Sequence, residues 1–132
     1  MKRKVIIFAS LLFAVMTALS SVSAQSPTRI QFAKGKSSAV VKGTTGEYGV
    51  TYVVRARSGQ KIVLDLSPSS KIGIKVETNG RYGQSVLLRE ESGGHYEVGL
   101  EENGDYTIFV GSTTNRPINF TLTVKITKLA DI

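Results

Sequence analysis

The sequence has no cysteine and no tryptophan, and it has only one histidine in 132 residues. Without cysteine the chain cannot form a disulfide, so its stability has to come from packing and hydrogen bonding. Zinc sites are normally built from thiolate and imidazole ligands, and one histidine cannot supply them. We therefore expect no metal centre and no cofactor.

Catalytic residues are equally scarce. The single histidine, His95, precedes Tyr96 in an alternating segment, which predicts that it points outward beside Glu97. The Gly-x-Ser-x-Gly motif of a nucleophile elbow is absent. A surface histidine without a partnered nucleophile does not indicate catalysis, so the prediction is that the protein is not an enzyme.

The N-terminal segment has the pattern of a cleaved export signal. Lys2-Arg3-Lys4 is a positive start, Val5–Leu19 is an apolar run, and Ser21–Ala24 supplies small residues for cleavage after Ala24. The predicted organisation is a signal peptide over 1–24 and one domain over 25–132, with no membrane anchor. Export without disulfides is typical of a bacterial periplasmic or secreted protein.

The charge is mildly basic. The whole chain carries +7, and three of these charges lie in the predicted signal peptide, which leaves +4 for residues 25–132. The lysines and arginines are scattered rather than clustered, so a nucleic-acid partner is not expected. A weak, non-specific attraction to anionic lipid, lipopolysaccharide or acidic proteins is compatible with this charge.

Strong alternation organises the C-terminal part of the chain. In Ile118–Ile126 every even-numbered residue is apolar and every odd-numbered one is polar, which predicts a half-buried strand. Gly104–Val110 has the same character, and the turn-forming segment Gly111–Pro117 joins the two. We predict that these strands pair as an antiparallel hairpin.

Similar short segments recur along the rest of the chain. The expected strands are Arg29–Ala33, Ser38–Gly43, Val50–Arg57, Lys61–Leu66, Lys71–Thr78, Gln84–Arg89 and His95–Leu100. Asn79-Gly80 is the strongest two-residue hairpin signal. No segment after the signal peptide has helical periodicity. Eight to nine alternating strands separated by turns predict an all-β antiparallel β-sandwich.

Four segments resemble the bacterial pre-peptidase C-terminal domain, in which a strand and a Gly-Gln turn precede an apolar strand and two later signature strands. They are Tyr52–Ala56, Ser58–Leu64, Gly104–Val110 and Phe120–Val124. The chain is still more similar to stand-alone periplasmic inhibitors of g-type lysozyme, through Ile30–Ala39, Gly59–Lys61 and the Asn115-Arg116 loop. The resemblance covers most of Phe32–Ile126 and implies a jelly-roll-like sandwich.

The same resemblance implies a partner-binding surface. In the inhibitors, lysozyme is bound by an aromatic residue after the second strand and by arginines between the last two strands. The matching positions here are Tyr48 and Arg116, with their neighbours Glu47 and Asn115. The loop around Arg116 is shorter than in the inhibitors and has one arginine, followed by Pro117, and Glu47 stands where an aromatic residue is expected.

Several functions follow as hypotheses. An arginine that reaches a catalytic carboxylate makes a charge-assisted bond, and tyrosine adds rigid contact area, so the resemblance implies a protein that occludes a lysozyme or another cell-wall hydrolase. The alternative is a carbohydrate- or envelope-binding module whose partner is a glycan or peptidoglycan. A third hypothesis is a structural envelope protein. Tyr48 and Arg116 also fit ordinary loop residues, with Tyr48 plugging the sandwich end. We expect a monomer or weak dimer.

The chain also has one acidic loop, at residues 101–105. Glu101–Asp105 comes nearest to a calcium-binding loop, because calcium needs several oxygen ligands from one segment. The alternative is a solvated turn in which Gly104 has positive φ, and the residue types favour this turn.

Overall fold

The computed structural model describes residues 27–80 and 83–129, which form strands and no helix. The predicted signal peptide, residues 1–24, lies outside these ranges. No helix in the described part of the chain is long and apolar enough to cross a membrane. The strands are β1 (Thr28–Arg29), β2 (Ser38–Thr44), β3 (Val50–Ala56), β4 (Gln60–Ser67), β5 (Ile72–Gly80), β6 (Gly83–Glu90), β7 (His95–Gly99), β8 (Gly104–Ser112) and β9 (Asn119–Lys128).

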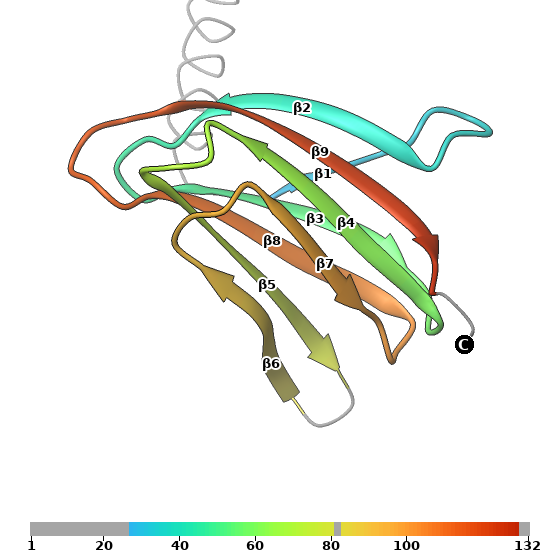
Figure 1. The fold of residues 1–132 in the computed structure, drawn as a ribbon. Coiled ribbons are helices and arrows are strands. Elements are labelled where there is room, and N and C mark those ends of the chain that lie inside the picture. Colours follow the sequence, from blue (N-terminus) through green and yellow to red (C-terminus); the bar gives the residue numbers. More distant parts are fainter. Residues whose placement is uncertain (1–26, 81–82, 130–132) are drawn as a thin grey trace, which may run out of the picture.

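The strands form two sheets that face each other as a sandwich (Figure 1). One sheet has the order β1-β3-β8-β5-β6, and the other has the order β2-β9-β4-β7. All neighbouring strands are antiparallel except β1 and β3, which run parallel. The all-β antiparallel sandwich predicted from the sequence is therefore confirmed, with one parallel pair at its edge.

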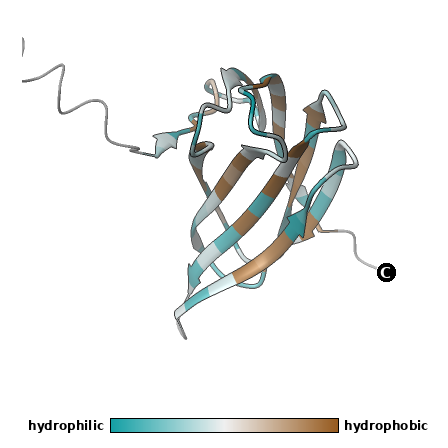
Figure 2. Ribbon diagram, turned by 90° about the vertical axis from the view of Figure 1, so that its left-hand side faces the viewer, coloured by the Kyte–Doolittle hydropathy of each residue, from teal (hydrophilic) through white to brown (hydrophobic). Residues whose placement is uncertain are grey.

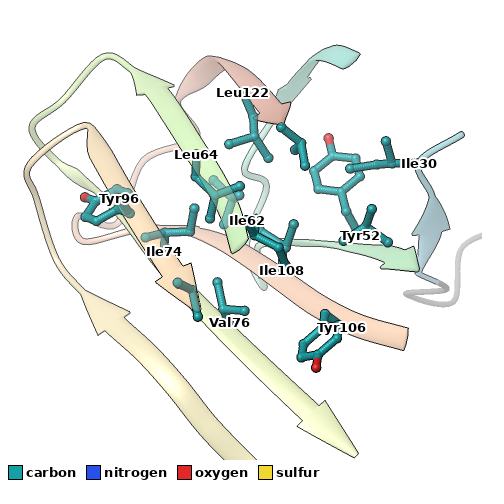
Figure 3. Packing of buried hydrophobic residues seen from close by; sticks show 14 of the residues in the cluster. Ile30, Tyr52, Ile62, Leu64, Ile74, Val76, Tyr96, Tyr106, Ile108 and Leu122 are labelled. Atoms are coloured by element: carbon teal, nitrogen blue, oxygen red, sulfur yellow. The ribbon is translucent and has the colours of Figure 1, made fainter. Parts of the chain in front are cut away.

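The core is formed by alternate residues of both sheets. Tyr106, Ile108 and Val110 of β8 are at most 1% exposed, and so are Leu122 and Val124 of β9. Figure 2 shows the resulting bands of hydrophobic and hydrophilic residues along the strands, and Figure 3 shows the side chains meeting between the sheets. The inward-facing residues expected for the third, fourth, fifth and seventh strands are all buried: Tyr52, Val54, Ala56, Ile62, Leu64, Leu66, Ile72, Ile74, Val76, Tyr96, Val98 and Leu100.

The predicted hairpin of the last two strands is wrong. β8 lies between β3 and β5 in one sheet, whereas β9 lies between β2 and β4 in the other. Each strand has one apolar face, and both faces are buried when the connecting segment, residues 113–118, crosses from one sheet to the other. β8 and β9 thus each lie inside a sheet, with a neighbouring strand on both edges.

Two local predictions also need correction. The first strand is Thr28–Arg29 rather than Arg29–Ala33, although Ile30 is buried and Phe32 packs partly buried against the core as expected. The β5–β6 hairpin exists, but Asn79 pairs with Gln84 and Gly80 with Gly83, so both residues belong to β5. The residues that connect the two strands are 81–82, which lie outside the described ranges.

Candidate functional site

The two predicted binding loops lie together at one end of the sandwich. The segment between β2 and β3 and the segment between β8 and β9 both turn at the left-hand end of Figure 1. A pocket of about 480 Å³ lies between them, and its walls include Gly46 and Glu47 from the first loop and Thr114, Asn115 and Pro117 from the second. The fold thus joins segments about seventy residues apart in the sequence into one surface.

Two of the predicted binding residues line the pocket, and the other two are exposed next to them in the chain. Glu47 and Asn115 line the pocket. Tyr48 and Arg116 follow them directly in the chain, and both are exposed, with 65% of Tyr48 open to solvent. Tyr48 therefore does not plug the end of the sandwich. In the described part of the chain no ion pair engages Glu47 or Arg116, so both charges are available to a partner.

Thr45 fastens the two loops to each other. Its side chain is fully buried, and its hydroxyl accepts a hydrogen bond from the Ile118 amide at 2.9 Å. The Thr45 amide in turn donates to the Ile118 carbonyl at 3.0 Å. Next to it the Thr44 hydroxyl donates to Asn119 Oδ1 at 2.6 Å. Two adjacent threonines are equally common in ordinary polar turns, so their residue types alone do not predict this anchor.

Hydroxyl groups also shape the second loop from within. The Thr114 amide donates to Ser112 Oγ at 3.0 Å, and the Arg116 amide donates to Thr114 Oγ1 at 3.2 Å. Serine and threonine hydroxyls commonly bind neighbouring backbone groups in turns in this way. The backbone of Arg116 is therefore held in place while its side chain extends into solvent, which lowers the entropy lost when it binds a partner.

The only histidine of the chain lies in a charged network on the outer face of the second sheet. His95 Nδ1 is 2.6 Å from Asp65 Oδ1, and His95 Nε2 is 3.0 Å from Glu97 Oε2. Lys61 Nζ donates to the other oxygen of Glu97 at 2.6 Å. Hydrogen bonds to Asp65 and then to Glu97 raise the pKa of His95. In the described ranges no hydroxyl binds this ring, so the network contains no activated nucleophile.

In the acidic loop at residues 101–105, the Asp105 carboxylate forms an ion pair with Arg29. Arg29 donates to both carboxylate oxygens of Asp105, at 3.1 and 2.8 Å, and these bonds hold the pKa of Asp105 below its ordinary value. Gly104 has the expected positive φ of 142°. Among the described residues no group of three or more histidine, aspartate or glutamate side chains is arranged to hold a metal ion. A calcium ion would have to displace Arg29 from Asp105.

The chain is similar to PliG, a periplasmic inhibitor of g-type lysozyme. The PliG of Aeromonas hydrophila matches with a TM-score of 0.67 and 27% sequence identity, over 76% of this chain and 96% of PliG. The PliG of Salmonella Typhimurium matches with a TM-score of 0.59 and 25% identity over the same shares.

A more distant similarity concerns the fold alone. The pre-peptidase C-terminal domain of a Bacillus anthracis collagenase matches with a TM-score of 0.51 and 15% identity, over 77% of this chain and 95% of that domain. No family model matches the chain, and no curated protein matches it. Both resemblances found in the sequence, to the pre-peptidase C-terminal domain and to the PliG inhibitors, are thus confirmed at the level of structure.

Proposed function

We propose that this protein is an exported, non-enzymatic inhibitor of a peptidoglycan-cleaving lysozyme, most directly of the g-type. The observation that carries the proposal is the similarity to two PliG inhibitors over 96% of their length, together with the convergence of the two loops at one pocket. The inhibitors are periplasmic, and the predicted signal peptide of this chain supports the same compartment.

The proposed mechanism is occlusion of the lysozyme cleft. Arg116 extends from a loop whose backbone is fixed by Thr114, and it has no ion pair in the described chain to give up on binding. A guanidinium group can pair with a catalytic carboxylate through two parallel hydrogen bonds. Tyr48, in the loop between β2 and β3, offers an exposed large ring with few rotatable bonds, which is the kind of residue that anchors protein interfaces.

The first test is lysozyme turnover on bacterial cell walls, with the mature domain titrated into g-, c- and i-type enzymes. The proposal predicts stoichiometric inhibition of one type through a 1:1 complex. Truncating an interface anchor typically costs about 2 kcal/mol or more. The Arg116→Ala variant is therefore expected to bind about thirtyfold more weakly than the wild type.

A matched control separates the loop from overall charge. Lys128→Ala removes one exposed positive charge at the opposite end of β9 and should leave inhibition unchanged. Equal inhibition by Arg116→Ala and the wild type would contradict the loop assignment. Absence of inhibition for all three lysozyme types at micromolar protein would contradict the proposed function.

One observation favours the alternative, a carbohydrate-binding protein. A second pocket, of about 200 Å³, lies on the outer face of the first sheet and is lined by Phe109, Lys75 and Arg89. Lys75 Nζ is 5.4 Å from the centre of the Phe109 ring. An aromatic ring beside polar groups suits a sugar. This function predicts sedimentation of the protein with insoluble peptidoglycan and no effect on lysozyme turnover.

A further inference from the structure

A separate pocket lies at the end of the sandwich opposite the two loops. β1 pairs only with Tyr52 and Val53, so the rest of the β3 edge is not covered by that strand. Beyond β1 the chain crosses the seam between the sheets before β2 begins, and the Ile126 amide of β9 donates to the Ser37 carbonyl at 2.9 Å. A pocket of about 400 Å³ remains in this seam. Its size is within the range of small-molecule sites.

The lining of the seam pocket combines positive charge with an apolar wall. Lys36, Arg55 and Arg57 supply the charge, Phe32 and Ile126 form the apolar side, and no acidic residue lines the pocket. The three basic side chains are exposed, and in the described ranges none of them takes part in an ion pair. Three like charges around one small pocket repel one another, so an anion placed among them is stabilised.

The carboxylate nearest to Arg55 in the strand pairing, Asp105, is already paired with another arginine. Asp105 lies opposite Arg55 in the pairing of β3 and β8, but Arg29 donates to both of its oxygens. Arg55 adds only the smallest of the interactions that hold the pKa of Asp105 low. In the described ranges no ion pair joins Arg55 to Asp105, so the guanidinium donors of Arg55, which lines the seam pocket, are available to a ligand there.

The position of the second arginine is fixed by its own turn. The Arg57 amide donates to Gln60 Oε1 at 2.8 Å, and the Gln60 amide donates to the Arg57 carbonyl at 3.2 Å. Gln60 itself lines the pocket. The backbone that carries Arg57 is thus held by the pocket's own wall, which reduces the ordering that a ligand would have to impose.

We propose that the seam pocket binds a phosphomonoester whose organic part is apolar or ring-shaped. Two guanidinium groups and one ammonium group supply positive charge, and the planar fork of a guanidinium group can donate two parallel hydrogen bonds to two oxygens of a phosphate group. Phe32 and Ile126 then contact the organic part. The ligand is either a soluble phosphate ester or the headgroup of a phosphate-bearing lipid. The pocket is independent of the lysozyme-binding loops, which lie at the other end of β3.

The test measures binding of two probes to the mature domain at about 0.15 M salt, where surface charges are screened. Glucose 1-phosphate, followed by calorimetry, represents a soluble ester, and vesicles of phosphatidylcholine with phosphatidic acid, followed by sedimentation, represent a lipid. Binding is expected for at least one probe, and which probe binds identifies the source of the phosphate. Removing both guanidinium groups with Arg55→Gln and Arg57→Gln should weaken it at least about tenfold, as loss of one charged hydrogen bond already would.

The matched control is the pair Lys42→Gln and Lys71→Gln, which removes the same charge from exposed positions outside the seam pocket. It should bind as the wild type does. If the paired arginine variant does not fold, Lys36→Gln in the segment before β2 gives the same comparison. Absence of binding for both probes, or equal weakening by the control pair, would overturn the proposal.

Discussion

At the scale of the residue, Gly49 is required both by its left-handed backbone conformation and by the lack of room for a side chain. Its φ is +81°, and a Cβ built there would lie 2.5 Å from the Phe109 ring and 2.8 Å from the Val110 carbonyl oxygen. Gly49→Ala should lower the free energy of unfolding by about 1–2 kcal/mol because of the left-handed backbone. The clash of the new Cβ should lower it by about 1–3 kcal/mol more. Urea unfolding monitored by circular dichroism measures the total loss.

Gly59 provides the matched control for this prediction. It has a similar φ of +85°, but a Cβ there would meet no heavy atom within 4 Å. Gly59→Ala should therefore show only the backbone cost. Equal losses in stability for the two variants would mean that the Phe109 ring moves aside without penalty.

His95 gives a second prediction at this scale. Because Asp65 and Glu97 both bind the protonated ring, its pKa in the folded state is above the ordinary 6.5. The contribution of His95 to stability is therefore complete below about pH 6.5 and is lost as the pH rises through the folded-state pKa. An NMR titration of the ring should give a pKa above 6.5. A measured value at or below 6.5 would contradict the network.

The stability profile supplies an independent check on His95. The melting temperature of the wild type should fall as the pH rises through the folded-state pKa of His95. His95→Gln keeps polar atoms on the ring's side of the sheet but cannot titrate, so this part of the pH dependence should disappear in the variant. The Lys61–Glu97 pair, with N and O 2.6 Å apart, remains in both proteins.

At the scale of the element, the arrangement of the two loops of the proposed binding site depends on Thr45. Thr45→Val removes the hydroxyl that accepts the Ile118 amide and leaves that donor without its partner. The expected loss of stability is about 1–3 kcal/mol. The proposed function adds that lysozyme inhibition should weaken, because Glu47 and Asn115 would no longer be held across one pocket.

Thr45→Ser is the control for the Thr45 prediction, because it keeps the hydroxyl and removes only a methyl group. If the hydrogen bond positions the loops, the serine variant should inhibit lysozyme as the wild type does, while the valine variant should not. Inhibition by the valine variant at wild-type strength, with unchanged urea unfolding, would show that Thr45 has no such role.

At the scale of the whole molecule, the two sheets share one core, and no disulfide supports them. Leu122 is fully buried in β9, between the sheets. Leu122→Ala should therefore cost about 2–5 kcal/mol, a large part of the roughly 5–15 kcal/mol that stabilises a typical domain. Its neighbour Thr123, whose side chain points to the opposite face, is the control, and Thr123→Ala should change stability little.

The shared core also predicts one unfolding transition. In urea, the far-ultraviolet circular dichroism and the tyrosine fluorescence should change with the same midpoint in the wild type and in Leu122→Ala. Two separate transitions would indicate that the sheets unfold independently, which the buried contacts between them do not allow.

The sequence by itself determined which residues of most strands are buried. The two-residue period of a strand is a local property, so it places Ile62 and Leu64, for example, in the core whichever strands lie beside them. The positions of Tyr48 and Arg116 in exposed loops followed from the turn residues around them, and their proposed role followed from the resemblance to the inhibitors.

Only the tertiary structure decided which strands are neighbours. β8 and β9 carry the same alternating pattern, and that pattern is satisfied equally by a hairpin and by a crossing between two sheets. The same limit applies to both pockets. Thr45 meets Ile118, and Lys36 approaches Arg55 and Arg57, because distant segments are brought together by the packing of the sheets. A local pattern carries no information about such contacts, whereas the shared core fixes them.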